Sequence, residues 1–374
     1  MENIQMVDLK GQYKKIKAEI DAAVLDCIES TAFINGPAVK IFATSLAQHL
    51  DAARVIPCAN GTDALQIAMM ALGLERGDEI IVPAFTYIAT AEVIGLLGLV
   101  PVMVDVDPRT FNITAEHIRK AITPKTKAVV PVHLFGQSAD MESIMKLAAE
   151  HNLYVIEDTA QAIGAEYTFS DGRKQKVGTI GHIGCTSFFP SKNLGCYGDG
   201  GAIMTNDAQL GEKIQIIANH GQIKKYVHKY IGVNSRLDTL QAAILGVKLK
   251  YLNDYSAARR KAADYYDQQL NGIEGITVPV RASNSTHVFH QYTLKVAGNR
   301  DELKTFLESK GIPAMIYYPI PLNEQEAFQG LGRVEGSLDV TINLCQTVLS
   351  LPIHTEMDTA QQDYIIGGIK EFFK

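Results

Sequence analysis

The sequence has few cysteines and no pattern of residues that would bind a metal ion. Its 374 residues include five cysteines, and none of them stands in a C-x-x-C arrangement. A sparse, odd-numbered set of this kind argues against a disulfide framework and a zinc site. No pair or triad of His, Asp, Glu or Cys falls at metal-ligand spacing, so no metal is predicted. We expect a protein of a reducing, cytoplasmic environment.

Long hydrophobic runs and basic clusters are also missing. The most apolar stretch, residues 89–106, is interrupted by acidic residues, glycines and a proline, too often for a membrane-spanning helix. The first five residues show no basic segment followed by an apolar run, so no signal peptide is expected. The net charge is −6 and the basic stretches are short, which argues against a nucleic-acid surface. We expect no membrane partner and no nucleic-acid partner.

Strand-like and helix-like patterns alternate over the first two thirds of the chain. Short runs rich in Val and Ile, such as residues 79–82 and 154–157, are separated by stretches with apolar residues at helical spacing. This alternation predicts an α/β fold with a mostly parallel sheet flanked by helices. We place this large domain at residues 13–250.

The last third of the chain has a different pattern. A long helical region is expected at about 235–270, followed by short strands at 276–280, 290–296 and 314–318 and by two helices. No Pro/Ser-rich linker separates the two parts. We expect a smaller C-terminal α/β domain over residues 251–374, with residues 1–12 packing against it.

A polar tetrad directly after a predicted strand suggests a phosphate site. Asn60, Gly61, Thr62 and Asp63 open a predicted helix. Free N–H groups at a helix N-terminus attract anions, and a glycine permits close approach. An ordinary N-cap formed by Thr62 or Asp63 explains the same residues, so the tetrad alone leaves both interpretations open.

Asp158 stands at the carboxyl end of a predicted buried strand, the edge at which open α/β sheets bind ligands. A carboxylate there can keep a pyridinium nitrogen protonated, or it can serve as a cap or an ion-pair partner. Gln161, three residues further on, can reach the same ring or close a turn.

Lys192 follows another predicted strand, in a loop rich in glycine. A lysine at the rim of a sheet can form a Schiff base when its pKa is lowered, although a surface lysine in a turn is commoner. The order of the motifs favours the first interpretation. Gly61, Asp158 and Lys192 match the phosphate, the ring nitrogen and the aldehyde of one cofactor.

Carrying these motifs, the sequence resembles the DegT/DnrJ/EryC1/StrS family of sugar aminotransferases, which are pyridoxal-phosphate enzymes of fold type I. The resemblance covers nearly the whole chain, from residue 7 to residue 352. Its specific motifs lie at residues 60–65, 83–90, 157–161, 187–192, 198–201 and 232–238. It implies fold type I and pyridoxal 5′-phosphate as the cofactor.

The resemblance also implies roles for residues around the cofactor ring. Lys192 would bind the aldehyde and, once freed, transfer protons as general acid and base. Asp158 would bind the pyridine nitrogen, Tyr87 would stack on the ring, and Gln161 would lie beside it.

Further matching residues would bind the cofactor phosphate. Gly61, Thr62 and Ser187 would do so within one chain, and Asn234 would reach across from a second subunit. The resemblance therefore implies a homodimer with a shared active site. Without it, Tyr87 is a core aromatic residue and Asn234 a helix cap.

Within the family, three stretches look most like one branch: residues 188–201, 234–245 and 318–323. That branch aminates C3 of UDP-2-acetamido-2-deoxy-3-oxo-glucuronic acid with L-glutamate as donor, for bacterial surface polysaccharide (O-antigen, lipopolysaccharide). Two residues depart from common family patterns. Tyr317 stands where a His before Tyr-Pro is usual, and Asn323 where many relatives that act at C4 carry His. The second departure supports the C3 branch, and the first leaves one substrate contact open.

Arg236 and Tyr318 are candidate substrate contacts. The guanidinium of Arg236 suits the carboxylate of glutamate or of the uronic acid, and an intrahelical salt bridge explains it equally well. Rival functions are amination of another nucleotide sugar, either a UDP-4-keto or a dTDP-3-keto sugar, and a non-catalytic regulatory protein that binds the cofactor. The family's dehydratases lack the Schiff-base lysine, so Lys192 argues against that class.

Overall fold

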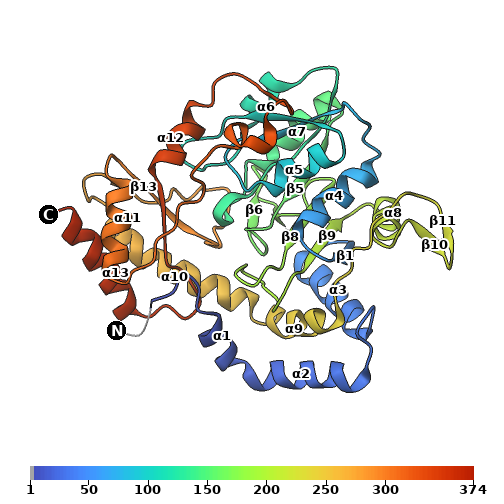
Figure 1. Ribbon diagram of the computed structural model, residues 1–374, viewed down its shortest axis with the longest axis horizontal. Coiled ribbons are helices and arrows are strands. Elements are labelled where there is room, and N and C mark those ends of the chain that lie inside the picture. Colours follow the sequence, from blue (N-terminus) through green and yellow to red (C-terminus); the bar gives the residue numbers. More distant parts are fainter. Residues whose placement is uncertain (1–3) are drawn as a thin grey trace.

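In the computed structural model, which describes residues 4–374, an eight-stranded sheet forms the centre of the larger part of the chain (Figure 1). Its strand order is β1-β9-β8-β5-β4-β2-β3-β14. Neighbouring strands are parallel except around β9, which is antiparallel to both β1 and β8. The predicted mostly parallel sheet is confirmed. The strands are Arg54–Cys58 (β1), Glu79–Pro83 (β2), Val100–Val104 (β3), Thr126–Val129 (β4), Tyr154–Asp158 (β5), Ile183–Ser187 (β8), Gly201–Thr205 (β9) and Arg333–Val334 (β14).

Helices cover both faces of this sheet, as a parallel sheet requires. One face is packed by α4 (Gly61–Leu72), α5 (Ala89–Leu96) and α8 (Ala208–Ala218). The other is packed by α6 (Ala115–Ala121) and α7 (Met141–His151). Each connection returns the chain to the same end of the sheet, so the loops that follow the parallel strands gather at one edge.

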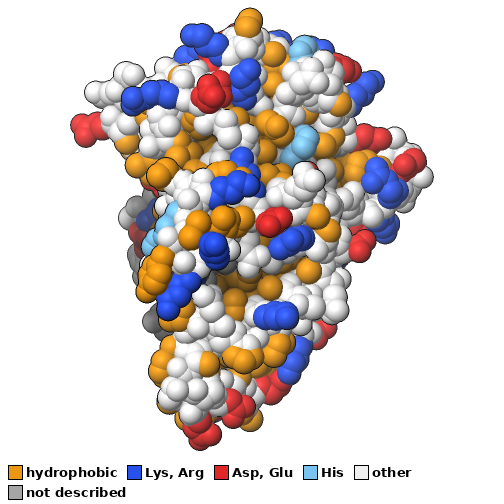
Figure 2. Space-filling model, turned by 90° about the vertical axis from the view of Figure 1, so that its right-hand side faces the viewer, with side chains coloured by type: hydrophobic (Ala, Val, Ile, Leu, Met, Phe, Trp, Pro, Cys, Tyr) orange, Lys and Arg blue, Asp and Glu red, His pale blue; other side chains and the backbone are white. Residues whose placement is uncertain are grey.

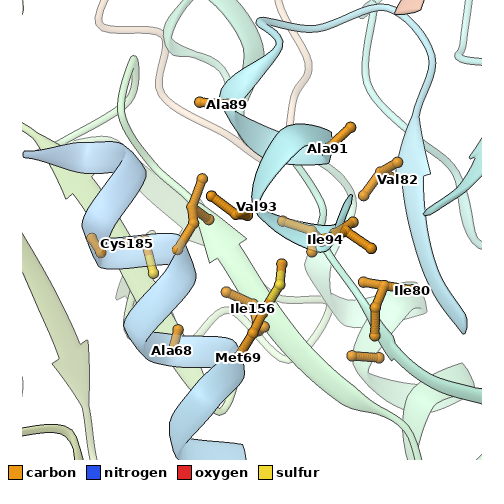
Figure 3. Packing of buried hydrophobic residues seen from close by; sticks show 14 of the residues in the cluster. Ala68, Met69, Ile80, Val82, Ala89, Ala91, Val93, Ile94, Ile156 and Cys185 are labelled. Atoms are coloured by element: carbon orange, nitrogen blue, oxygen red, sulfur yellow. The ribbon is translucent and has the colours of Figure 1, made fainter. Parts of the chain in front are cut away.

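The alternation of side chains along β2 separates the two faces. Ile80 and Val82 join the core under α4 and α5, whereas Ile81 joins the core on the other side. Figure 3 shows Ile80 and Val82 with Met69 of α4 and Ile94 of α5. Such continuous apolar runs are typical of strands that are buried on both faces.

The N-terminal helices lie against a helix from the middle of the chain. After α1 (Leu9–Lys15), both α2 (Lys17–Ser30) and α3 (Pro37–Leu50) pack on α9 (Thr239–Leu249). The long helical region predicted at 235–270 is in fact two helices, because α10 (Leu252–Leu270) starts separately. The two helices join different cores: α9 packs beside α3, whereas most of the buried hydrophobic residues of α10 join the C-terminal core.

The C-terminal part is built on a second, three-stranded antiparallel sheet. Its strands, in spatial order, are β12 (Ile276–Thr277), β13 (Tyr292–Val296) and β15 (Val348–Leu351). They form one core with α10, α11 (Arg300–Ser309) and α13 (Thr359–Phe372).

The strand predicted at 314–318 is wrong. Of these residues only Met315 makes a β-bridge, to Ser350 of β15. The strand that pairs with β13 is β15 itself, which directly follows α12 (Asp339–Thr347). The residues after Met315 leave the sheet to line the cavity described below.

The N-terminal segment packs against this C-terminal part where the structure describes it. Ile4 lies in the C-terminal core, and the carbonyl of Met6 accepts a hydrogen bond from the N–H of Ile353. Residues 1–3 lie outside the described residues, so the expectation for residues 1–12 is addressed only from residue 4 onward.

One stretch of the expected small domain packs on the large sheet. Strand β14 pairs with β3, and Leu322, Phe328 and Leu338 join the core under α4 and α5. The division into two domains near residue 250 stays a prediction. This stretch belongs to the second domain by sequence but packs against the first.

The remaining elements are short. No helix within residues 4–374 is long and apolar enough to cross a membrane. The short elements are β6 (Glu166–Thr168), β7 (Lys174–Lys176), β10 (Gln222–Lys224), β11 (Val227–His228) and three 3₁₀ helices, Leu134–Gly136, Leu322–Glu324 and Glu326–Phe328.

Candidate active site

A cavity of about 870 Å³ opens at the carboxyl ends of the central strands. This is the edge at which open α/β sheets bind ligands. The fold brings eight of the ten predicted site residues to its lining, from segments far apart in the sequence. They are Gly61, Thr62, Tyr87, Asp158, Gln161, Ser187, Lys192 and Tyr318.

The first turn of α4 forms a cradle of backbone donors at one end of the cavity. The N-cap is Asn60, whose Oδ1 accepts a hydrogen bond from the N–H of Asp63 at 2.8 Å. The alternative that Thr62 or Asp63 caps this helix is therefore wrong. Gly61 and Thr62 occupy the first turn, where N–H groups have no partner within the helix.

Gly61 allows this turn to lie directly against the end of β8. A Cβ atom at position 61 would stand 2.8 Å from Cβ of Ser187, which is too close. Glycine therefore brings the helix N-terminus and the Ser187 hydroxyl to one concave surface. Backbone donors, a hydroxyl and the helix dipole together suit a phosphate group.

Asp158 presents a buried carboxylate at the end of β5. Its Oδ2 accepts a hydrogen bond from the hydroxyl of Thr90 at 2.9 Å, and its Oδ1 accepts one from the N–H of Ala160 at 3.1 Å. These two donors hold the carboxylate in a fixed orientation. Thr90 was not predicted as a site residue, because a hydroxyl in the first turn of a helix is a weak signal by itself.

The neighbouring carboxylate, Glu157, has a structural role on the opposite face of the strand. It is fully buried and accepts hydrogen bonds from the N–H groups of Gly178, Ile180 and Gly181 at 2.6–2.8 Å. It also pairs with Nε2 of His133 at 2.9 Å. Because successive side chains point to opposite faces, only Asp158 faces the cavity.

Lys192 is half-buried in the wall of the cavity. Burial lowers its pKa to about 8, while the negative charge of Asp158 acts in the opposite direction. A lysine with such a pKa holds a useful fraction of neutral, nucleophilic amine near neutral pH.

The loop that carries Lys192 is held from behind by α9. The buried ammonium of Lys248 donates a hydrogen bond to the carbonyl of Gly195 at 2.5 Å. Oε1 of Gln241 accepts a hydrogen bond from the N–H of Tyr197 at 2.8 Å. These contacts fix the loop against the core rather than leaving it free in solvent.

Two tyrosines and Gln161 form another wall. Gln161 accepts a hydrogen bond from the N–H of Phe135 at 2.6 Å and donates one to the Tyr318 hydroxyl at 3.0 Å. The rings of Tyr87 and Tyr318 lie 6.2 Å apart, and the Tyr87 ring is 57% exposed. Burial raises the pKa of Tyr318, so its hydroxyl keeps its proton. Tyr317, the departure from the family pattern, also lines the cavity.

Asn234 and Arg236 do not reach the cavity of their own chain. Asn234 is exposed and bridges to Asn219 through its backbone. Arg236 lies along a separate hollow with Lys40 and Arg54. It precedes α9, and its side chain makes no salt bridge within residues 4–374, so an intrahelical salt bridge does not explain it.

The lining of the cavity has an excess of negative charge. The lining contains the carboxylates of Asp63, Asp158 and Asp199 but a single lysine, Lys192. Two polar residues from the C-terminal part, His290 and Gln291, also line it; neither is among the predicted site residues. Within the described part of the chain, no group of three or more His, Cys, Asp or Glu side chains is placed to hold a metal ion.

Comparison with known proteins identifies close relatives. Residues 14–370 match the model of the DegT/DnrJ/EryC1/StrS aminotransferase family. The chain is 46% identical over 366 residues to the UDP-2-acetamido-2-deoxy-3-oxo-D-glucuronate aminotransferase of Pseudomonas aeruginosa, covering 98% of this chain and 99% of that protein. It is also 46% identical over 374 residues to a Geobacillus stearothermophilus protein named pleiotropic regulatory protein, covering 100% and 99%.

A solved structure shares the fold. NtdA from Bacillus subtilis, with bound cofactor PMP, superimposes with a TM-score of 0.87 at 33% identity, covering 96% of this chain and 82% of that chain.

Proposed function

Since the chain belongs to the DegT/DnrJ/EryC1/StrS aminotransferase family, we propose that it transfers the amino group of L-glutamate to C3 of UDP-2-acetamido-2-deoxy-3-oxo-glucuronic acid. It is a nucleotide-sugar aminotransferase of fold type I, and its cofactor is pyridoxal 5′-phosphate. The observation that carries the proposal is one cavity in which Lys192 and Asp158 face the phosphate cradle at Gly61.

The residues present fit this cofactor. The cradle of Gly61, Thr62 and Ser187 would hold its phosphate, and the carboxylate of Asp158, oriented by Thr90, would hold its ring nitrogen. When bound, pyridoxal phosphate supplies an aldehyde that accepts amino groups and a ring that withdraws electrons from the bond being broken.

The other residues of the chain position groups and move a proton. Lys192 would bind the aldehyde and, once displaced by glutamate, take the proton from the α-carbon of glutamate. The amine suits this task because burial lowers its pKa to about 8, close to the pH at which a general base is most effective. Tyr87 would cover the ring and Gln161 would lie beside it. We keep Tyr318 as a substrate contact.

Charge supports the further proposal that a second copy of the chain completes the site. The cofactor phosphate, the UDP diphosphate and the uronate are all anionic, yet the cavity lining has three carboxylates and one lysine. Binding these anions therefore calls for further cationic or hydrogen-bond-donating groups from outside this lining. We propose that Asn234 and Arg236, which lie outside their own cavity, reach that of a second copy in a homodimer.

The surface of the chain offers such a contact. The hairpin of β10 and β11 exposes Lys224, Lys225 and Lys229 next to Tyr226 and Ile231, which are 81% and 89% exposed. Figure 2 shows this side of the molecule, where Lys and Arg side chains lie among hydrophobic ones. A patch that is both apolar and basic suits a protein partner and an anionic ligand together.

The choice of sugar rests on similarity and on one sequence feature. The relative from Pseudomonas aeruginosa is named for the 3-oxo-glucuronate sugar, and Asn323 replaces the His of many relatives that act at C4. The product would feed bacterial surface polysaccharide, such as O-antigen. We also propose a cytoplasmic location, because all five cysteines are free and buried and a reducing compartment keeps them so.

An absorbance spectrum of the purified protein, before and after addition of glutamate, tests the proposal. The band of the lysine-bound cofactor, expected near 410–420 nm, should collapse towards about 330 nm when glutamate delivers its amino group. Adding UDP-3-oxo, UDP-4-oxo and dTDP-3-oxo sugars separately should then restore the band only with the true acceptor. No band after incubation with cofactor would reject the role of Lys192.

The same spectrum separates the enzyme from a regulatory protein, the name given to the Geobacillus relative. A protein that binds the cofactor but never exchanges an amino group with glutamate would favour that second function. Lys192→Ala should keep the fold and lose more than about 100-fold of the turnover, as removal of a catalytic acid/base does.

A further inference from the structure

His290 is a buried histidine in the wall of the cavity that contains Lys192. It precedes β13, is 5% exposed, and lines the cavity together with Lys192 and Gln291. Its Nδ1 is buried and has no hydrogen-bond partner within residues 4–374. Buried polar atoms almost always have hydrogen-bond partners. We therefore expect this nitrogen to gain a partner during the reaction.

The backbone around His290 is clamped. Buried Arg259 donates hydrogen bonds through Nη1 to the carbonyls of Phe289 at 3.0 Å, His290 at 3.3 Å and Ile353 at 3.0 Å. The backbone at His290 is therefore held in place, and the ring is buried in the wall of the cavity.

The ring is also held neutral. Burial lowers the pKa of His290 well below its ordinary value, and the positive charges of Lys192 and Arg259 lower it further. A neutral imidazole offers one acceptor nitrogen and one N–H donor. It can therefore stand beside a lysine without repelling its ammonium form.

Lys192 needs such an acceptor once it leaves the cofactor. Asp158, whose negative charge acts on Lys192, already accepts hydrogen bonds from Thr90 and Ala160. The proposed function assigns its remaining hydrogen-bonding capacity to the cofactor ring. An amine that must take a proton from carbon has to aim its lone pair, which requires its N–H groups to be held elsewhere.

We propose that His290 is a positioning residue that accepts a hydrogen bond from the freed Nζ of Lys192 and aims its lone pair at the α-carbon of glutamate. Lys192 gains and returns the proton, and His290 neither gains nor loses one. This inference rests on the proposed function for the identity of the substrate, but the contact between His290 and Lys192 can be tested without substrate.

A matched pair of variants tests the contact. His290→Asn keeps a hydrogen-bond acceptor near the position of Nδ1, and His290→Leu has nearly the same size without one. His287→Leu is the control: His287 is also buried and lies three residues away along the chain, but it stacks on Phe289 and is not part of the cavity lining. If His290→Leu does not fold, His290→Phe replaces it in the comparison.

The first readout uses the cofactor-free protein. Reductive methylation of Lys192, followed by mass spectrometry across a pH series, reports the titration of its amine. A hydrogen-bond acceptor stabilises the ammonium form. The titration should therefore move to lower pH by about half a unit to one unit in His290→Leu and by less in His290→Asn. It should not move in the His287 control.

The second readout is the half-reaction of the cofactor-loaded protein with glutamate. We expect the rate to fall about 10- to 100-fold in His290→Leu, part of the effect of a positioned acid/base, with the KM for glutamate nearly unchanged. The isotope effect with α-deuterated glutamate should rise, because proton transfer becomes slower relative to binding. His290→Asn should recover part of the rate.

The outcomes separate this inference from the proposed function. If His290→Leu titrates and reacts as the wild type does, with the same isotope effect, the positioning role is rejected. If the wild type itself does not react with glutamate, the proposed function fails, and the titration of Lys192 alone still decides whether His290 contacts it.

Discussion

The hydroxyl of Thr90, on α5, donates a hydrogen bond of 2.9 Å to Oδ2 of Asp158, at the end of β5. Both residues are buried, so the bond is protected from water and from salt. Asp158 receives its second hydrogen bond from the N–H of Ala160. The carboxylate proposed to hold the cofactor nitrogen is thus oriented by a helix from a distant part of the sequence.

Replacing Thr90 by Val should weaken cofactor binding. Val has the same shape but lacks the hydroxyl, and a hydrogen bond to a charged group contributes about 1.5–3 kcal/mol. This corresponds to an increase in the Kd for pyridoxal phosphate of roughly 10- to 100-fold, measured by titrating the cofactor-free protein. Thr90→Ser should retain most of the affinity. Binding by the Val variant within about twofold of wild type would contradict the importance of this contact.

Gly61→Ala should lose cofactor affinity and stability together. The new Cβ would stand 2.8 Å from Cβ of Ser187, and relief of such a clash costs about 1–3 kcal/mol. Gly367→Ala is the matched control, because Gly367 is exposed within α13 and nothing lies within 4 Å of its added Cβ. The control should be stabilised by about 0.5–1 kcal/mol. Urea unfolding of both cofactor-free variants should show a lower free energy of unfolding for Gly61→Ala and a higher one for Gly367→Ala.

Lys248→Met should change how stability depends on pH. Burial lowers the pKa of Lys248 from 10.5 to about 8, so between these values the unfolded chain binds a proton that the folded chain lacks. The free-energy cost of burying Lys248 in the folded state therefore decreases as pH rises. The stability of Lys248→Met relative to wild type should fall by roughly 1–2 kcal/mol between pH 7.5 and 9.5.

The comparison must be made between variants because buried cysteines act in the opposite direction. Burial raises the pKa of Cys58, Cys185 and Cys345, so their contribution to stability is lost as pH rises through the ordinary range for thiols. This contribution is common to wild type and variant and cancels. Lys174→Met, at an exposed lysine, is the control for removing a lysine side chain.

Mixing two inactive variants should restore activity if the site is shared. In a heterodimer of Lys192→Ala with Asn234→Ala, one of the two sites combines Lys192 of one chain with Asn234 of the other. Random exchange of equal amounts makes half of the dimers mixed, so about a quarter of the sites should be intact. The fraction of intact sites is measured as the activity of the mixture compared with the activity of each variant alone.

A second mixture controls for exchange. Lys192 and Asp158 line the same cavity of one chain, so Lys192→Ala mixed with Asp158→Asn should stay inactive. Recovery in this control, or none in the first mixture, would contradict a site shared through Asn234.

Elements with strong local signals were predictable, and elements set by packing were not. The cavity-facing position of Asp158 follows from a buried strand that ends in a carboxylate. The break between α9 and α10 and the pairing of β14 with β3 have no local signal, because each depends on which core the segment joins. The stretch after Met315 looks like a strand but leaves the sheet to line the cavity.

The sequence by itself determined the kinds of groups and their order along the chain: a glycine that opens a helix, a carboxylate that ends a strand and a lysine in the loop after another strand. Because the strands are parallel, it also determined that these groups meet at one edge of the sheet. Only the tertiary structure decided that Thr90 orients Asp158 and that His290 lines the same cavity as Lys192. Only the tertiary structure placed Asn234 and Arg236 outside the cavity of their own chain. The reason is physical, because burial, pKa and hydrogen-bond partners arise from contacts between residues that are remote in sequence and leave no local pattern to read.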